Sequence, residues 1–188
     1  MRVSLRISLI AFLSALGVIL SPFWFPVLAS KAYPAQHLIN SLAGVLLGPI
    51  DAAIIAIIIG IIRNNLGLGT IYAFPGGIPG GVVVGVFYRF LRGRLSGSRA
   101  MKLSIFTEPI GTVLIGATLS IYIVAPWVND VAMLNKVSAV GLIPIYVGWF
   151  LSSISGVIIA LFILAALERA GLIALMGSGD VESRRRTH

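Results

Sequence analysis

The chain has 188 residues, 58% of them hydrophobic and 11% charged, with a mean hydropathy of +1.03 and a formal net charge of +8. A soluble domain is about half apolar and about one quarter charged, so this composition excludes an ordinary soluble protein and predicts an integral membrane protein. The length suits a single domain over residues 1–188. Cysteine is absent, which excludes disulfides, Cys-ligated zinc and thiol chemistry.

Six segments are apolar enough to be transmembrane helices, although a full crossing needs about 20 mostly apolar residues and the second, third and fourth are short. They cover residues 5–21, 36–47, 51–62, 78–91, 103–125 and 142–167. A cleaved signal peptide is the alternative for the first segment, but its length and the aromatic run after it favour a helix. We therefore predict an all-α bundle of six transmembrane helices.

The basic residues flank these segments, which is typical of the positive-inside rule and of contact with anionic lipids, and does not indicate a nucleic-acid partner. If both termini are cytoplasmic, only three of the 14 Lys and Arg residues lie on the outer side, namely Lys31, Arg63 and Lys136. The basic tail, about residues 177–188, would then be cytoplasmic. The outer loops, 22–35, 64–77 and 126–141, are rich in aromatic residues, prolines and amides, and predict an outward-facing pocket.

The second segment begins with a polar group of residues. Gln36 and Asn40 are four residues apart and His37 and Asn40 are three apart, so they share one side of a helix, just after Tyr33. One interpretation is a ligand pocket, and the other is a histidine that is only hydrogen-bonded within the bundle. His37 has no histidine or carboxylate partner at a suitable spacing, so we expect no metal site, and no cofactor is indicated.

The third segment ends in Arg63-Asn64-Asn65, and glycine turns, Tyr72 and Phe74 follow. An arginine at the bilayer centre costs about 2.5 to 3.5 kcal/mol, so one interpretation is an Arg63 that snorkels to the outer interface. The two amides and the aromatic residues favour a ligand contact or a gating role instead. Trp127 in the third outer loop is a further candidate, although interfacial tryptophans are common anchors.

Glu108 lies within the fifth segment, directly before Pro109. A carboxylate inside a membrane segment indicates a functional role by default. The alternative is a helix cap or a salt bridge to the nearby basic loop. No Ser-His-Asp set, paired catalytic carboxylates or P-loop is present, so we expect neither catalysis nor ATP hydrolysis by this chain.

Small residues form a stripe on the first segment at spacings of four, three and four. They are Ser4, Ser8, Ala11 and Ala15. In lipid, helices associate where small residues allow their backbones to approach. The stripe therefore predicts either packing inside the bundle or a docking face for a partner membrane protein.

Several stretches resemble the ThiW family of substrate-binding S-components of energy-coupling factor (ECF) transporters. They are YPAQHLIN (33–40), IRNNLGLGTIYAFPGG (62–77), EPIGT (108–112) and IVAPW (123–127), and the Ala11-x-x-x-Ala15 spacing resembles the docking face of such proteins. The resemblance implies a subunit of the prokaryotic plasma membrane that binds hydroxyethyl-methylthiazole, the thiazole precursor of thiamin, from outside. It also implies delivery by reorientation on a T-component with two ATPase subunits.

A small flat ligand needs a closed pocket with aromatic stacking and a few polar partners. We expect Tyr72, Phe74 and Trp127 to stack, and Arg63 to hold the loop closed. The hydrogen-bonding candidates are Gln36, His37, Asn40, Asn64 and Asn65. Three alternatives stay open: thiamin or its pyrimidine half as ligand, a proton-coupled secondary transporter using Glu108 or His37, and an assembly subunit without a small-molecule ligand.

Overall fold

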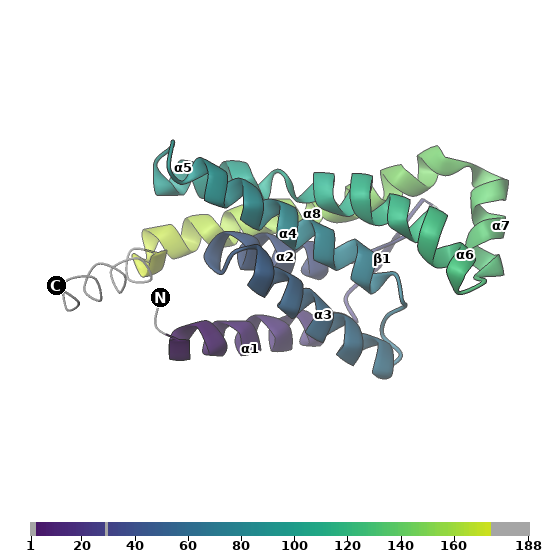
Figure 1. Cartoon of the computed structure of the whole chain (residues 1–188), viewed down its shortest axis with the longest axis horizontal. Helices are drawn as coiled ribbons and strands as arrows, with labels where there is room; N and C mark the ends of the chain where they lie inside the picture. The colour runs from purple at the N-terminus through teal and green to yellow at the C-terminus, as the bar shows by residue number, and fades with distance from the viewer. Residues whose placement is uncertain (1–2, 29, 174–188) are drawn as a thin grey trace.

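In the computed structural model, which describes residues 3–28 and 30–173, six main helices run lengthwise through the molecule (Figure 1). They are α1 (Val3–Ile19), α2 (Pro34–Leu46), α3 (Pro49–Asn65), α4 (Ala73–Leu91), the helix Gly97–Trp127 and α8 (Leu142–Arg169). Each contains most of one segment predicted from hydropathy, because that signal follows apolar runs. The all-α architecture is confirmed.

The helix Gly97–Trp127 is not uniform. It comprises α5 (Gly97–Ile105), the π-helical stretches η1 (Ile110–Ala117) and η2 (Ser120–Val124), and α6 (Ala125–Trp127). The wider turns begin just after Pro109, a residue that has no backbone N–H to donate to the preceding turn. π-Helical turns are frequent at functional sites, and Glu108 lies at this transition.

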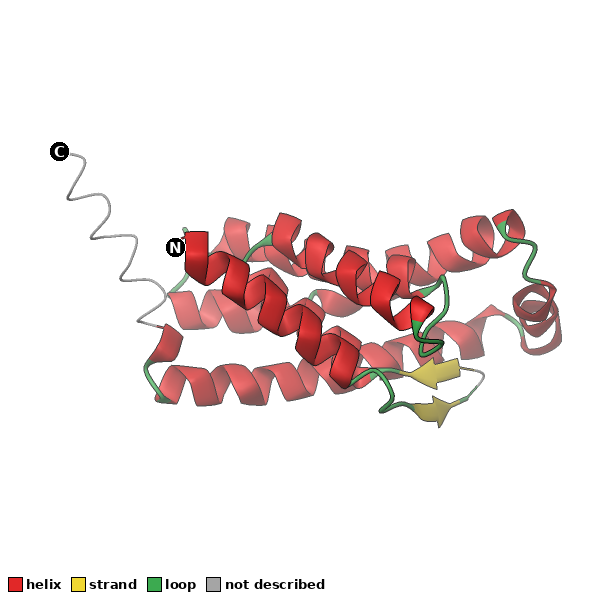
Figure 2. Cartoon of the chain, turned by 90° about the horizontal axis from the view of Figure 1, so that it is seen from below, coloured by secondary structure: helices red, strands yellow, loops and turns green. Residues whose placement is uncertain are grey.

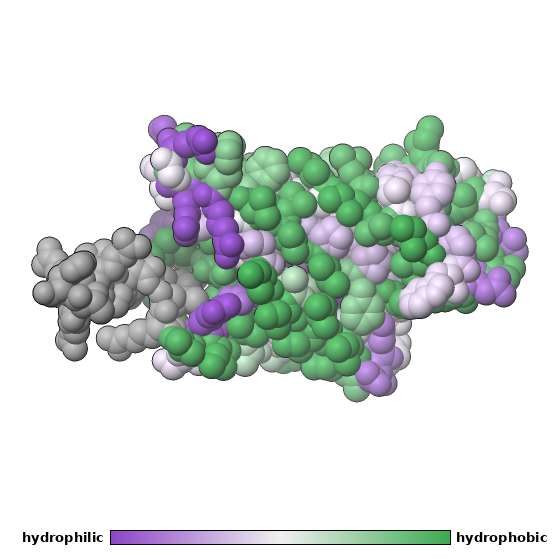
Figure 3. All heavy atoms as spheres, in the orientation of Figure 1, coloured by the Kyte–Doolittle hydropathy of each residue, from purple (hydrophilic) through white to green (hydrophobic). Residues whose placement is uncertain are grey.

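Three of the described helices are long and apolar enough to cross a membrane: α4, Gly97–Trp127 and α8. Figure 3 shows a hydrophobic surface over the middle of the molecule and hydrophilic residues gathered towards its two ends. The beginning of α1 and the end of α8 lie at the same end (Figure 1). The crossing of all six helices and the cytoplasmic side of the termini stay predictions. The basic tail at 177–188 lies outside the described residues.

The opposite end carries structure that hydropathy did not predict. A hairpin of β1 (Phe25–Val27) and β2 (Ser30–Ala32) forms in the first loop, and β2 packs against α8 (Figure 2). A further helix, α7 (Val131–Val140), forms in the last loop, with Asp130 accepting the backbone N–H of Met133 as its N-cap. We call this the hairpin end.

The second loop is shorter than predicted, because α3 continues through Asn65 and α4 already begins at Ala73. Because α4 begins this early, Pro79 lies inside the helix. The connection that remains, residues 66–72, lies at the hairpin end, beside the entry to α2.

α2 lies at the centre of the bundle, and its residues from His37 to Val45 are all buried. It packs against α4 and α8. A Cβ on Gly44 would lie 2.9 Å from the carbonyl oxygen of Gly81 and even nearer to Val84, so this close approach of α2 and α4 requires glycine. The short helix thereby brings its polar residues into the interior of the molecule.

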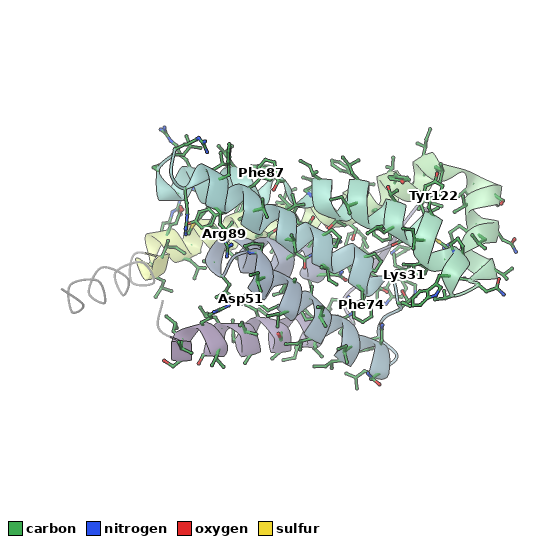
Figure 4. The ribbon with its side chains drawn as sticks, in the orientation of Figure 1. Lys31, Asp51, Phe74, Phe87, Arg89 and Tyr122 are labelled. Atoms are coloured by element: carbon green, nitrogen blue, oxygen red, sulfur yellow. The ribbon has the colours of Figure 1, made fainter. Side chains whose placement is uncertain are left out.

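α1 is attached by one side only. Leu13, Ser14 and Gly17 are buried, whereas the whole stripe of small residues, Ser4, Ser8, Ala11 and Ala15, is exposed. Within residues 3–28 and 30–173, the internal-packing interpretation of this stripe is therefore wrong. Arg6 joins α1 to Asp51 of α3 by two hydrogen bonds of 2.6 Å, and Figure 4 shows Asp51 between these helices.

Candidate ligand-binding site

A cavity of about 280 Å³ lies at the hairpin end of the bundle. It has room for roughly nine waters at about 30 Å³ each, which is the scale of a small heteroaromatic molecule. Its lining comes from the hairpin (Ser30, Lys31), the entry to α2 (Tyr33, Gln36, His37), the end of α3 (Arg63), the 66–72 loop (Thr70, Tyr72), the start of α4 (Ala73, Gly76), α7 with its cap (Asp130, Ala132, Met133, Lys136) and α8 (Trp149, Ser152). Residues far apart in the sequence therefore form one site.

The start of α2 supplies one wall of the cavity. Pro34 fixes the first turn of the helix, and residues 33, 36 and 37 then fall on one side. The backbone N–H of Tyr33 donates to Oγ of Ser152 at 2.8 Å, which ties this turn to α8. Tyr33, Gln36 and His37 of this turn all line the cavity.

Arg63 fastens the 66–72 loop to α2. Its side chain is only 3% exposed; Nη1 donates to Oε1 of Gln36 at 2.6 Å, and Nη2 approaches the carbonyl oxygen of Leu68 at 3.5 Å. The guanidinium also lies 4.6 Å from the centre of the Tyr33 ring, within cation–π range. The snorkelling interpretation is therefore wrong: Arg63 is buried in the protein and joins the loop to the cavity wall.

A second contact joins two of the segments that line the cavity. The hydroxyl of Tyr72 donates to Oδ2 of Asp130 at 2.7 Å, which connects the 66–72 loop to α7. Burial raises the pKa of Tyr72 above its usual range, and hydrogen bonds from the backbone of Met133 and from Tyr72 lower the pKa of Asp130. At neutral pH the phenol is thus protonated and the carboxylate ionised, which are the forms that make this contact.

Behind His37 lies a fully buried carboxylate, that of Glu108. Its hydrogen-bond partners come from three helices: His37 and Asn40 of α2, Thr112 of its own helix, and Ser153 of α8. The proposed salt bridge or cap involving the basic loop is therefore wrong, because Glu108 is paired with His37 at 3.0 Å in the interior. Buried polar groups that are fully hydrogen-bonded make a bundle specific and rigid.

A fourth helix approaches the same carboxylate through a glycine. A Cβ on Gly80 of α4 would overlap Oε1 of Glu108 and Oγ1 of Thr112, and it would lie 3.1 Å from Nδ2 of Asn40. No side chain fits at this position without displacing the network. α2, α4, α8 and the helix Gly97–Trp127 therefore converge on Glu108, directly behind the cavity.

The structure brings five of the candidate residues to the cavity: Tyr33, Gln36, His37, Arg63 and Tyr72. Asn40 and Glu108 lie behind His37. The remaining four lie elsewhere. Asn64 packs against the Gly69 turn, Asn65 is exposed with its amide bonded to the carbonyl of Ile61, Phe74 packs against Gly60, and Trp127 is 79% exposed.

The residues that sequence reasoning missed come mainly from α8 and α7. Trp149 and Ser152 lie in a long apolar segment, where a tryptophan suggests an interfacial anchor and a serine suggests helix packing. The pair Ser152-Ser153 within that segment was the available signal. Asp130, Met133 and Lys136 had no comparable signal, because α7 was expected to be a loop.

The side chains that line the cavity include more positive than negative charges. Lys31, Arg63 and Lys136 line it, against the single carboxylate of Asp130. Trp149, Tyr33 and Tyr72 supply aromatic faces and Gln36, His37 and Ser152 supply hydrogen-bonding groups. Among residues 3–28 and 30–173, no group of three His, Cys, Asp or Glu side chains could hold a metal ion. The arrangement suits a small, flat, polar molecule bound by stacking and hydrogen bonds.

Long apolar helices around an interior cavity at one end of the bundle define a multi-pass membrane protein that handles a small solute. The family model described as thiamine-precursor transporter protein (ThiW) matches residues 7–170, so the chain belongs to the ThiW family. The resemblance stated from the sequence is thereby confirmed, and the chain is a transport protein of the cell membrane. No curated protein and no solved structure gave a match.

Proposed function

We propose that this chain is the substrate-binding S-component of an ECF transporter and that its ligand is hydroxyethyl-methylthiazole. The observation that carries the proposal is the cavity of about 280 Å³, with aromatic side chains and a few polar groups at one end of a membrane bundle. Such a mixture is typical of small-molecule sites. The family description names a precursor of thiamine, and the thiazole is the precursor that we favour.

Size and charge support a small aromatic ligand. The thiazole has roughly nine non-hydrogen atoms, so at the ceiling of about −1.5 kcal/mol per atom it reaches nanomolar affinity only if nearly every atom makes a contact. A cavity with Trp149 on one side and Gln36, His37 and Ser152 nearby offers such contacts. Thiamin itself carries a positive charge, which Lys31 and Arg63 disfavour.

The exposed face of α1 supports a membrane partner. Ser4, Ser8, Ala11 and Ala15 are all exposed, so no part of this chain covers them among the described residues. Small residues permit close backbone contact between helices in lipid. We assign this face to the T-component, whose two associated ATPase subunits would hydrolyse the ATP.

Tryptophan fluorescence of the purified chain tests the ligand. We expect hydroxyethyl-methylthiazole to bind with sub-micromolar affinity and to change the emission, and thiamin and hydroxymethylpyrimidine to bind at least about tenfold more weakly. Trp149→Phe should remove most of the fluorescence change, because Trp149 lines the cavity. The matched control Trp127→Phe should retain it, because Trp127 is 79% exposed and lies outside the cavity. Failure of all three compounds to bind folded protein would refute the proposal.

Uptake into cells that express the chain with and without an ECF module tests the partner. Ala11→Leu and Ala15→Leu should abolish uptake and leave thiazole binding unchanged, because they obstruct the exposed face of α1. Ala166→Leu, at an exposed position of α8, is the matched control and should transport normally. Normal uptake by the two α1 variants would show that this face is not the docking surface.

A proton-coupled secondary transporter is the second candidate, and the buried pair of His37 and Glu108 is the observation that favours it. Such a protein would transport thiazole in cells lacking any ATPase module, and an uncoupler would stop it at once. We favour the S-component, because Glu108 is fully buried, is held by four hydrogen-bond partners and does not line the cavity.

A further inference from the structure

The carboxylate of Glu108 is surrounded by donors. Oε1 lies 3.0 Å from Nδ1 of His37, 3.1 Å from Nδ2 of Asn40 and 2.6 Å from Oγ1 of Thr112, and Oε2 accepts from Ser153. An ionised carboxylate only accepts hydrogen bonds, so the ring hydrogen of His37 lies on Nδ1. The other three donors are neutral and solvate the carboxylate, so it does not require a charged ring, and a neutral ring with its hydrogen on Nδ1 leaves Nε2 without one.

This state of the ring determines what Ser152 does. Nε2 of His37 lies 3.0 Å from Oγ of Ser152, and the same Oγ accepts the backbone N–H of Tyr33 at 2.8 Å. A serine hydroxyl has one hydrogen and two lone pairs. Because bare Nε2 can only accept, the Ser152 hydrogen is directed at the ring. Tyr33 occupies one lone pair of Oγ, and the other lone pair is free.

Both His37 and Ser152 line the cavity. We propose that Glu108 is a positioning residue that acts through His37 to make Ser152 a hydrogen-bond acceptor at the cavity wall, so that the site selects ligands carrying a hydroxyl or another donor. If the ring hydrogen lay on Nε2, the direction of the hydrogen bond between His37 and Ser152 would reverse. Ser152 would then accept from the ring and donate its own hydrogen to the ligand. The inference deepens the proposed function and rests on it for the ligand, but the state of the ring does not depend on it.

Nitrogen chemical shifts of the histidine ring test the first half of the inference without any ligand. The chain has two histidines, so ¹⁵N-histidine labelling of the variant His188→Asn leaves the signal of His37 alone. We expect a protonated Nδ1 and an unprotonated Nε2 in the folded protein at neutral pH. A protonated Nε2, in either the charged ring or the other tautomer, would overturn the proposal.

Ligand selectivity tests the second half. We expect the wild-type chain to bind hydroxyethyl-methylthiazole about three- to tenfold more tightly than ethyl-methylthiazole, the range for one neutral hydrogen bond. Glu108→Met should remove this preference, and Glu108→Gln should restore much of it, because an amide oxygen still accepts from Nδ1. The matched control Ser104→Ala, which deletes a buried hydroxyl of the same helix outside the network, should keep the full preference.

If Glu108→Met does not fold, Ser152→Ala replaces it, because removal of the acceptor itself should also make the two thiazoles bind equally. A full preference for the hydroxyl in a folded Glu108→Met or Ser152→Ala variant would overturn the proposal. If neither thiazole binds the wild-type chain, the proposed ligand is wrong. The chemical shifts of the ring nitrogens still test whether Glu108 positions His37. The two failures are thus distinguishable.

Discussion

Gly80→Ala is the most informative single change in this bundle. Alanine in place of a glycine within a helix normally stabilises the helix by about 0.5–1 kcal/mol. At position 80 the added methyl group would overlap Oε1 of Glu108 and Oγ1 of Thr112, and it would lie 3.1 Å from Nδ2 of Asn40. None of these atoms can move without breaking a hydrogen bond to the carboxylate, so the structure predicts destabilisation in place of the usual gain.

The expected size follows from two terms. Overpacking a well-packed interior costs about 1–3 kcal/mol, and each hydrogen bond lost from a charged group costs about 1.5–3 kcal/mol. With one such bond lost and the helix gain subtracted, we expect a net loss of about 2–5 kcal/mol in stability. Ligand affinity should fall at least about tenfold, because a shift of Glu108 also displaces His37, and tenfold corresponds to only about 1.4 kcal/mol.

Thermal unfolding in detergent and thiazole titration measure both effects. Gly97→Ala, at the start of α5, is the matched control, because no atom lies within 4 Å of a Cβ added there. It should be as stable as the wild-type chain, or slightly more so. If Gly80→Ala unfolds at the wild-type temperature and binds thiazole normally, then α4 does not pack on the carboxylate as described.

Three further predictions concern contacts at the two ends of the bundle. Arg63→Met should weaken thiazole binding by about tenfold or more, because it removes the charged hydrogen bond from Arg63 to the side chain of Gln36. Calorimetry measures this affinity, and an unchanged value would mean that binding does not depend on the contact between the 66–72 loop and α2. Tyr72→Phe should weaken binding by a factor that stays constant between pH 5 and pH 9. The lowered pKa of Asp130 means that its contact with Tyr72 is lost only as pH falls below the usual carboxylate range, and the raised pKa of Tyr72 keeps the phenol protonated up to pH 9. A factor that varies with pH within that window would contradict this account. Arg6→Gln should lower the unfolding temperature by leaving Asp51, which is 2% exposed, without its charged partner, and the double variant Arg6→Gln/Asp51→Asn should recover part of the loss; no recovery would show that the pair is not coupled.

The membrane class and the helices could be predicted from the sequence, because they depend on local composition. Apolar runs such as residues 142–167 identify a helix wherever they occur, since backbone groups in lipid must be bonded within the segment. The stretches 33–40 and 62–77 also sufficed to indicate the family. The position of Tyr33, Gln36 and His37 on one side of a helix followed from their spacing, and their place on the outer side of the membrane stays a prediction from the asymmetry of charge.

Which polar residues meet could not be predicted, because this depends on how the helices pack. Glu108 and His37 are 71 positions apart, and nothing local indicates that α2 and the helix Gly97–Trp127 bring them together. Trp127 and Trp149 look alike in the sequence, yet one is exposed and the other lines the cavity. Likewise, a stripe of small residues on α1 fits packing inside the bundle as well as contact with another membrane protein, and the sequence does not distinguish the two.

The sequence by itself therefore determined that this protein is built for a membrane, where its six main helices lie along the chain, and its family, since hydropathy and motif content reside in consecutive residues. Only the tertiary structure decided that Arg63 is buried in the cavity wall, that Ser152 belongs to the cavity, and that Glu108 lies behind His37. The physical reason is that glycines such as Gly44 and Gly80 set how closely the helices approach. That distance selects which side chains face one another across the bundle.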